Sequence, residues 1–508
     1  MPSGSTGEPV NIGTSHAASQ LHDPLGHPPH PNASSHPRRE ASGDTELGVW
    51  ASPLAIDEDS SETFGFDSKQ AKMRYERALH YSPHQFVGLI PVEEFLETFM
   101  DCGRVLREWS DRIPPSADAF TKVPKMANKE SQIYEPLIKA LNSYIEPESS
   151  QARFRCPGFR FLDTSDRPDR EHGDVGKLKP DICCYAEPHV ELVQSALSED
   201  DKIKNRGATV MGYAALFIEV KRVPGMDPFV DLPASRDRSR WRFVLNFQGV
   251  GSAVMQDAMR GCFGQNVTYA AEILARQHRQ FLYSILVCGT VARFIRWDRA
   301  GALVSSAFDI HRSPEHLCRF LWCFALASDM GRGYDVNVEM AHPHEHELFE
   351  AVIRQHLASQ LPTKSTPAQL EQALKVHFLQ DHVTAIRFPL DNSKEVKRLL
   401  VSRPFVYPLA VFGRGTRAYW AVDASAPRDS AHRVVLLKDT WREDPPSNTQ
   451  TEKEVMQNLR QVGGLDGVPS VLFDGDVIQR DEVVTRYPDQ RFYMAVQDLR
   501  SENIRIID

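Results

Sequence analysis

The segment that most constrains the fold is Ala214–Val220, a short run made almost wholly of apolar residues. A run of this length, bounded by polar residues, is typical of a strand. Three runs downstream, at 281–287, 292–297 and 302–310, also predict strands separated by turns. The middle of the chain is therefore expected to hold a β-sheet.

Helical patterns lie on both sides of these strands. The clearest spans about 128–145, where Ile133, Leu137, Leu141 and Ile145 are spaced by four. The other expected elements are helices at 91–107, 252–259, 269–280 and 314–327, and strands at 154–161 and 181–186. Because helices and strands follow one another in this order, we expect one domain of the α/β or α+β class over residues 86–341.

The rest of the chain divides by composition. Residues 1–85 are rich in Ser, Gly, His and Pro at their start, which predicts a disordered tail. Residues 342–400 are expected to form a connector with two helices, at about 345–360 and 367–379. Residues 401–508 show strands separated by turns, with one helix at about 449–462.

Composition limits the classes of function. The 508 residues hold 59 Lys and Arg against 68 Asp and Glu, a net charge of −9, which disfavours a protein that coats nucleic acid. The 8 cysteines have neither zinc spacing nor the density of a disulfide framework. No apolar stretch is long enough to span a membrane, and no secretory signal begins the chain. We expect an intracellular protein, cytoplasmic or nuclear, without a membrane partner.

One set of residues in the 86–341 domain suggests a metal site. Asp181 opens one predicted strand, and Glu219-Val220-Lys221 ends another. Because side chains alternate along a strand, Glu219 and Lys221 share one face, which is expected to point into a groove beside Asp181. Two carboxylates suit Mg²⁺, and the lysine could position an attacking water or offset charge on a phosphate. We therefore expect catalytic roles for Asp181, Glu219 and Lys221, with Asp181 and Glu219 as Mg²⁺ ligands.

These residues resemble the motif of the PD-(D/E)xK nuclease superfamily, and the resemblance covers roughly residues 125–310. It implies a Mg²⁺-dependent nuclease acting on DNA or RNA, with a further glutamate from the preceding helix, Glu130 or Glu135. Residues 201–300 hold 15 Lys and Arg against 8 Asp and Glu, and the Arg-rich stretch 236–242 could contact nucleic acid. A solvated arginine face and an ordinary strand end are the alternatives.

The C-terminal part carries a second pattern. Gly413 and Gly415 lie between strand-like runs, where the backbone can approach phosphates. Lys438 ends the apolar run Val434–Leu437, and a predicted helix follows with Glu454, or less favourably Glu452, to pair with it. A glycine loop, a strand lysine and a helix glutamate in this order are typical of a protein-kinase small lobe.

This part resembles the fungal-type protein kinase family in Gly413–Thr416, Leu437–Arg442 and Gly467-Val468-Pro469. The resemblance continues upstream over 217–221 and 281–310. The resemblance implies an antiparallel sheet with one helix and a kinase that transfers phosphate from ATP to protein. Gly413, Gly415, Lys438 and Glu454 would bind ATP, with Ala418 in place of the third loop glycine.

The kinase pattern is incomplete. Asp498 and Asn503 have the spacing of a catalytic loop, but Val496-Gln497 stand where His-Arg is expected. Too few residues separate Glu454 from Asp498 for the remaining small lobe and two large-lobe helices. We therefore expect a kinase homologue truncated in its catalytic part, with ATP binding in the millimolar range or weaker and no phosphoryl transfer. A Mg²⁺-dependent nuclease and a non-catalytic scaffold are the alternatives, and the protein substrate or partner is unknown.

Overall fold

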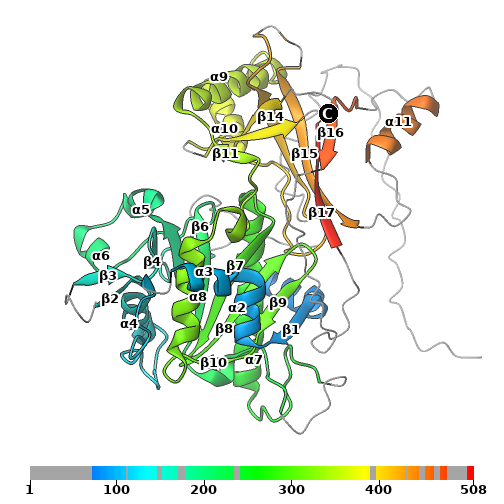
Figure 1. Cartoon of the computed structure of the whole chain (residues 1–508). Coiled ribbons are helices and arrows are strands. Elements are labelled where there is room, and N and C mark those ends of the chain that lie inside the picture. The colour runs from blue at the N-terminus through cyan, green and yellow to red at the C-terminus, as the bar shows by residue number, and fades with distance from the viewer. Residues whose placement is uncertain are drawn as a thin grey trace, which may run out of the picture. The chain divides into compact units, whose positions relative to one another are not determined.

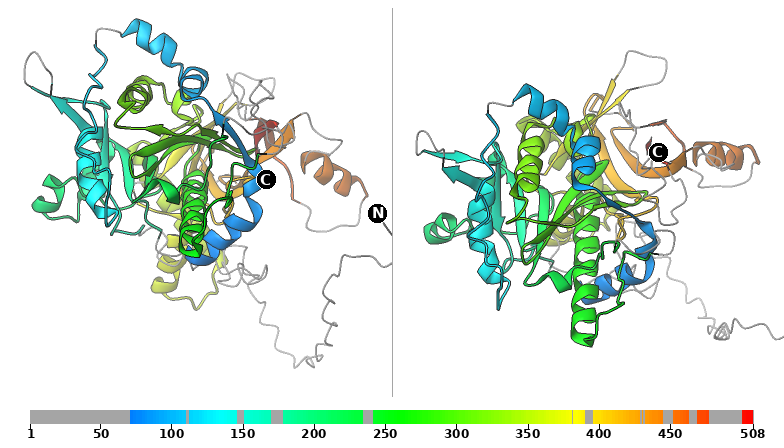
Figure 2. Two further views of the ribbon diagram at one scale, coloured as in Figure 1. Left: turned by 90° about the horizontal axis from the view of Figure 1, so that it is seen from below. Right: turned by 60° about the horizontal axis from the view of Figure 1, so that its bottom comes forward.

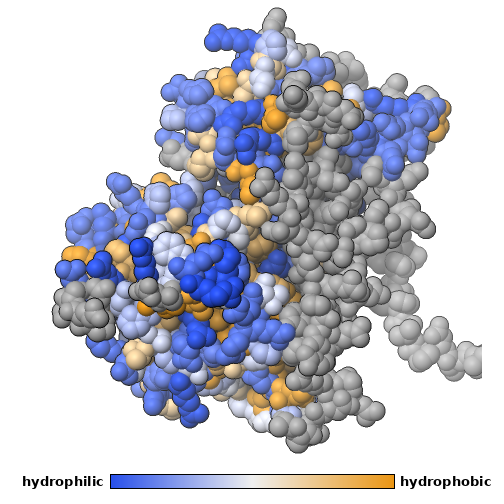
Figure 3. Space-filling view, in the orientation of Figure 1, coloured by the Kyte–Doolittle hydropathy of each residue, from blue (hydrophilic) through white to orange (hydrophobic). Residues whose placement is uncertain are grey.

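A computed structural model describes most of the chain from residue 71 onward. The described residues are 71–109, 112–145, 151–169, 178–233, 241–380, 382–389, 396–428, 430, 432–444, 452–462, 469–476 and 500–507. No helix in these ranges combines the length and apolar content needed to cross a membrane. On the face drawn in Figure 3, hydrophilic residues cover much of the coloured surface, and hydrophobic residues lie in separate patches among them.

A mixed sheet forms the centre of the first part. Among the described residues it has eight strands in the order β1–β9–β8–β7–β6–β5–β4, with β10 paired to β8. The strands are β1 (Phe86–Ile90), β4 (Phe159–Asp163), β5 (Ile182–Ala186), β6 (Ala214–Lys221), β7 (Phe281–Cys288), β8 (Val291–Asp298), β9 (Ala302–Ser305) and β10 (Phe308–Asp309). Neighbours are antiparallel except for the parallel pairs β6–β7 and β1–β9. The expected mixed α/β domain is confirmed at this level.

Helices cover both faces of this sheet (Figures 1 and 2). One face packs against α2 (Val92–Met100), α3 (Cys102–Glu108), α4 (Ser131–Asn142) and α8 (Pro314–Leu326). The predicted period of four holds for Ile133, Leu137 and Leu141, which are fully buried, but Ile145 lies beyond the helix in a short strand and is exposed. Each such buried side chain stabilises the fold by about 1.5–3 kcal/mol. The other face packs against α1 (Ala71–Tyr81) and α7 (Ala253–Arg276).

Helix α7 replaces the two helices predicted at 252–259 and 269–280. It runs without a break and belongs to the connection between β6 and β7. These strands are parallel neighbours, which need a crossover connection. Gly264 lies inside it, and a side chain there would bring its Cβ within 2.7 Å of the Tyr75 Cβ. This glycine therefore allows α1 to lie close against α7.

Helix α1 corrects the predicted boundary of the N-terminal tail. The tail was expected to reach residue 85, but Ala71–Tyr81 is helical and packs on α7. Arg74 forms an ion pair of 2.6 Å with Glu272 of α7, and both side chains are buried. The apolar spacing of Tyr75, Ala78 and Leu79 was a signal for this helix that the composition of the tail obscured.

Smaller elements complete the first part. A disulfide joins Cys102 of α3 to Cys323 of α8, two cysteines far apart in the sequence that no spacing rule would pair. The remaining elements are α5 (Glu187–Gln194), α6 (Glu199–Ile203) and a two-stranded sheet of β2 (Ser143–Ile145) and β3 (Ala152–Phe154).

A second, antiparallel sheet forms the C-terminal part. In the described ranges its order is β11–β12–β13–β14–β15–β17–β16. Its strands are β11 (Val338–Met340), β12 (Thr384–Pro389), β13 (Val396–Val401), β14 (Arg417–Asp423), β15 (Val434–Asp444), β16 (Phe473–Asp476) and β17 (Arg500–Ile507). Its helices are α9 (Pro343–Gln360), α10 (Pro367–His377) and α11 (Glu452–Val462).

The region 342–400 is not a separate connector. Both predicted helices are present as α9 and α10, but they pack on one face of the second sheet (Figure 1). The same region supplies β12 and β13 to that sheet. The boundary predicted at residue 401 is therefore wrong, because the apolar faces of α9 and α10 are buried only against strands on both sides of it.

Candidate functional site

Asp181, Glu219 and Lys221 come together in the first part. Lys221 Nζ donates a hydrogen bond of 2.5 Å to Glu219 Oε1, and the Val220 amide donates one of 2.8 Å to Asp181 Oδ2. The predicted alternation holds, because Val220 packs in the core that contains α4 while its neighbours point to the other side of β6. The expected juxtaposition of the two carboxylates beside the lysine is thus present.

The expected open groove is absent from this cluster. The exposed fractions are 8% for Asp181, 1% for Glu219 and 7% for Lys221. Tyr75 of α1 and Tyr269 of α7 lie on this side of the sheet, with their hydroxyls 3.4 Å apart, and the Tyr269 hydroxyl donates to the Lys179 carbonyl. The prediction of an exposed face was wrong because α1, which was assigned to the tail, helps to close it.

Helix α4 contributes two more polar groups to the cluster. The Tyr134 hydroxyl donates a hydrogen bond of 2.7 Å to Asp181 Oδ1, and Glu130 Oε1 lies 3.9 Å from Lys221 Nζ. Of the two candidate glutamates, Glu130 therefore faces the cluster, whereas Glu135 forms a surface ion pair with Lys139. Tyr134 was not predicted, because a hydroxyl donor has no spacing signature.

Burial controls the protonation of these groups. Burial, followed by the negative charge of Asp181, raises the pKa of Glu219 to about 8, although Lys221 opposes the shift. Burial also raises the pKa of Asp181. For Lys221, burial alone lowers the pKa, but the Glu219 carboxylate reverses that effect and the net pKa is raised. The cluster therefore keeps Lys221 in its charged form, and its carboxyl groups hold a proton more readily than exposed ones do.

The donor set fits Mg²⁺ poorly in this arrangement. Both Asp181 oxygens already accept hydrogen bonds, and Lys221 occupies one Glu219 oxygen. Of the Asp181 and Glu219 carboxylate oxygens, Glu219 Oε2 is the one that is buried without a hydrogen-bond partner. In the part of the chain that the structure describes, no three His, Cys, Asp or Glu side chains gather as a metal site. Magnesium, which needs several oxygen ligands, would require the cluster to open.

The second pattern gathers around Lys438 on β15. Lys438 Nζ donates to both carboxylate oxygens of Glu452, at 2.5 Å each, and both side chains are partly buried. The partner in the structure is thus Glu452, the less favoured of the two predicted glutamates, while Glu454 lies two residues further along α11 with its side chain exposed. Glu452 is the first residue of α11, where the helix dipole favours a carboxylate and the side chain can reach back to β15.

The glycine loop contacts the first part of the chain. Arg299, which follows β8, donates to the Ala410 and Val411 carbonyls at 2.9 and 2.8 Å, and its own carbonyl accepts from the Gly413 amide at 2.8 Å. A Cβ on Gly415 would lie 2.5 Å from Arg299 Nε. The glycine loop is therefore docked on the first part of the chain, and Arg299 accounts for the glycine at 415.

Apolar contacts hold the same loop. Val411 is fully buried within the core that contains α7, and the Phe412 ring packs edge-on against Phe86 with centroids 5.9 Å apart. Burial lowers the pKa of Arg299 to about 9, and the charge of Arg417 adds to the shift. These contacts hold the loop in place, and the Gly413 amide is already bonded to the Arg299 carbonyl.

Comparison with known proteins identifies the second pattern. Residues 231–504 match the family described as fungal protein kinase, and this range is more than half of the chain. The chain belongs to the fungal protein kinase family. No curated protein and no solved structure gave a significant match. The family predicted from Gly413, Gly415 and Lys438 is confirmed, whereas Asp181, Glu219 and Lys221 lie before the matched range.

Lys438 lies on a defined face of the sheet. Lys438 pairs with Ala418 across β14–β15, and Leu436 pairs with Trp420 two positions along. Because alternate residues share a face, Lys438, Leu436 and Trp420 lie on the same side. A nucleotide whose phosphates reached Lys438 would have its base near Trp420 and Leu436.

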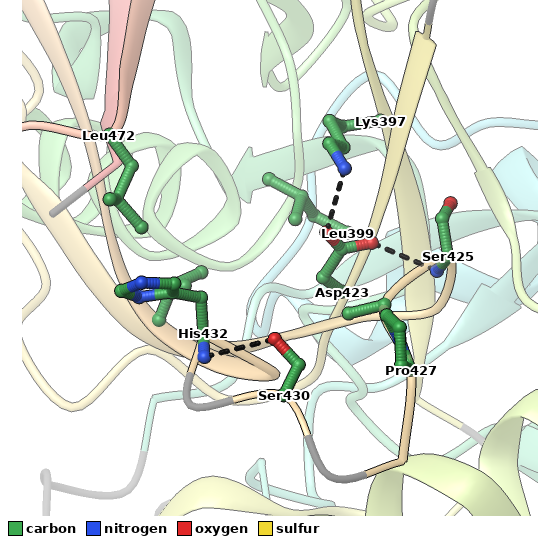
Figure 4. A pocket seen from close by; sticks show the side chains of 10 residues that line it. Lys397, Leu399, Asp423, Ser425, Pro427, Ser430, His432 and Leu472 are labelled. Atoms are coloured by element: carbon green, nitrogen blue, oxygen red, sulfur yellow. Dashed lines mark hydrogen bonds and ion pairs between the residues drawn. The ribbon is translucent and has the colours of Figure 1, made fainter.

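A pocket of about 240 Å³ lies on the opposite face of the same sheet (Figure 4). Leu399, Val435 and Leu472 form its apolar wall, and Asp423 pairs with Lys397 at 3.4 Å near its mouth. Val435 is three positions from Lys438 on β15, so the two side chains point to opposite faces of the sheet. The pocket is therefore separate from the face that carries Lys438.

Two other predicted features lie partly outside the described residues. Arg236, Arg238 and Arg240 are not described, and the Trp241 indole donates to the Val230 carbonyl while its ring packs on the core. Asp498 is also not described. Asn503 lies within β17, where its backbone pairs with Trp441, so it is part of a strand and not of a catalytic loop.

Proposed function

We propose that this fungal protein kinase family member binds ATP on the Lys438 face of its C-terminal sheet. Lys438 would contact the phosphates, and Glu452 would hold the lysine in place. Three features support this. The glycine loop joins β13 to β14, Lys438 lies on β15, the third strand counted from β13, and α11 then supplies the glutamate. The Lys438–Glu452 pair is the observation on which the proposal depends.

Binding is expected to be weak, on the order of millimolar, because Arg299 holds the Ala410 and Val411 carbonyls and the Gly413 amide, which restricts the loop from closing over phosphates. Magnesium would enter with the nucleotide, since the described residues near Lys438 include no cluster of metal-binding side chains. Lys438 can contact a phosphate while Glu452 holds the lysine, but an ion-paired glutamate is a poor base. We therefore expect no phosphoryl transfer to protein.

Calorimetric titration of the full chain with Mg-ATP tests this function. We expect a saturable signal that Lys438→Ala removes, while Lys397→Ala, on the pocket face, leaves it unchanged. Transfer of labelled phosphate to a generic protein substrate is measured in parallel. Binding that survives Lys438→Ala would refute the assignment of this face.

A second candidate function is nucleic-acid cleavage at the Asp181 cluster. Its support is the convergence of Asp181, Glu219 and Lys221, together with the parallel β6–β7 pair joined by α7. Mg²⁺, when bound, would supply an activated water there. Burial of the cluster counts against it. Mg²⁺-dependent cleavage of DNA or RNA that Glu219→Ala abolishes would support it, and cleavage that survives this change would assign the activity elsewhere.

A further inference from the structure

The helical pair α9–α10 packs on the same face of the sheet as Lys438. Its buried residues form one core with Leu400 of β13 and Val422 of β14, and Trp420 and Val434 pack against that core. Val434 and Lys438 lie on the same side of β15, because they are four positions apart. The face proposed for the nucleotide is therefore continuous with the face that these helices cover.

One side chain of α9 lies at the position expected for the base. The His356 ring contacts the Trp420 ring edge-on, with centroids 5.0 Å apart, and the Phe405 ring centroid lies 6.2 Å from that of Trp420. Trp420 is paired with Leu436, and Lys438 is two residues further along, about 7 Å away. A purine stacked on Trp420 would compete with His356 for the same surface.

Ion pairs fasten α9 in this position. Arg398 of β13 donates to both oxygens of Glu345 in the first turn of α9, at 2.5 and 2.8 Å. This fork lowers the pKa of Glu345 to about 2. Helix α10 is held by a hydrogen bond: Arg403, which follows β13, donates to the Lys375 carbonyl of α10 at 2.6 Å. The helices are thus attached to the sheet at their edges as well as through the core.

We propose that α9–α10 is an intramolecular cover of the nucleotide face, in which His356 takes the place of the base on Trp420. The proposal rests on the proposed ATP site and adds its regulation. ATP binds only to molecules in which α9 has moved away from Trp420, so the observed affinity is reduced by the population of the closed form. A change that weakens the His356 contact raises the affinity for ATP.

The test compares Mg-ATP binding to the full-length wild type, His356→Ala and Gln355→Ala. Gln355 is the neighbouring residue on the exposed side of α9 and serves as the matched control. We expect His356→Ala to tighten binding about three- to tenfold, the equivalent of one aromatic contact, and Gln355→Ala to change nothing. Lys438→Ala combined with His356→Ala should lose the binding.

Hydrogen exchange of the wild type provides a second measurement that needs no variant. Saturating Mg-ATP should speed exchange at α9 amides between 343 and 360. Equal affinities of wild type and His356→Ala, or α9 amides that become more protected with ATP, overturn the cover. If affinities are equal and Lys438→Ala abolishes binding, the ATP site stands and only the cover fails. If no variant binds, both proposals fail.

Discussion

Replacing Gly415 by alanine tests whether the glycine loop is docked on Arg299. The new Cβ would lie 2.5 Å from Arg299 Nε and 2.6 Å from its Cζ. The guanidinium cannot retreat cheaply, because it is buried and bound to the Ala410, Val411 and Leu274 carbonyls. Forcing extra atoms into such packing costs about 1–3 kcal/mol.

Gly413→Ala is the matched control. Gly413 has φ of 93° and Gly415 has φ of 50°, so alanine is strained at both, by roughly 1–2 kcal/mol. A Cβ at 413 would meet nothing within 4 Å. The strain is no smaller at Gly413 than at Gly415, since φ of 50° lies nearer the left-handed minimum. Any excess cost at Gly415 therefore measures the Arg299 contact.

Urea unfolding followed by tryptophan fluorescence gives both costs. We expect Gly415→Ala to lower the free energy of unfolding by about 1–3 kcal/mol more than Gly413→Ala does. A loop that undocks to avoid the clash would instead show faster hydrogen exchange at residues 410–415. Equal costs for the two variants, with no change in exchange, would refute the docked loop.

Three further predictions follow from the packing. Glu452→Gln should weaken Mg-ATP binding severalfold, as calorimetry can measure, because Lys438 donates to both carboxylate oxygens of Glu452, whereas Glu454→Gln, on the exposed side of α11, should leave it within about twofold. Arg74→Ala should cost about 1.5–3 kcal/mol in urea unfolding, since Glu272 is buried but keeps its ion pair with Arg276, whereas Lys72→Ala, at an exposed pair, should cost under about 0.5 kcal/mol. Burial, helped by the charges of His356 and Arg403, lowers the pKa of His377 to about 4, so its stabilising effect is present above pH 6.5 and is lost as the pH falls to 4. That loss is at most about 3 kcal/mol, and His377→Leu should remove it from the pH profile of urea midpoints.

The sequence predicted most elements of the first part because their signals are local. The period of four in α4 and the apolar run of β6 each reflect burial of one element against its neighbours. The break predicted inside α7 was wrong, because the pattern weakens where the helix is buried on several sides. Helix α1 was missed because the composition of the preceding tail obscured the apolar spacing of Tyr75, Ala78 and Leu79.

The candidate sites were predictable in identity but not in environment. Alternation along β6 was enough to bring Glu219 and Lys221 together near Asp181. The covering of that cluster by Tyr75, and of the Lys438 face by α9, depends on packing between segments far apart in the chain. The choice between Glu452 and Glu454 depended on where α11 begins, and helix ends are the least certain feature of a sequence pattern.

Labelling with an ATP derivative that carries an amine-reactive acyl phosphate tests the central claim most directly. Such a reagent acylates a lysine that lies beside its phosphates, and mass spectrometry then identifies the modified residue. We predict that Lys438 is acylated, that excess Mg-ATP prevents it, and that His356→Ala increases it. Acylation spread over surface lysines, with Lys438 unmodified or insensitive to Mg-ATP, would contradict a nucleotide site on this face.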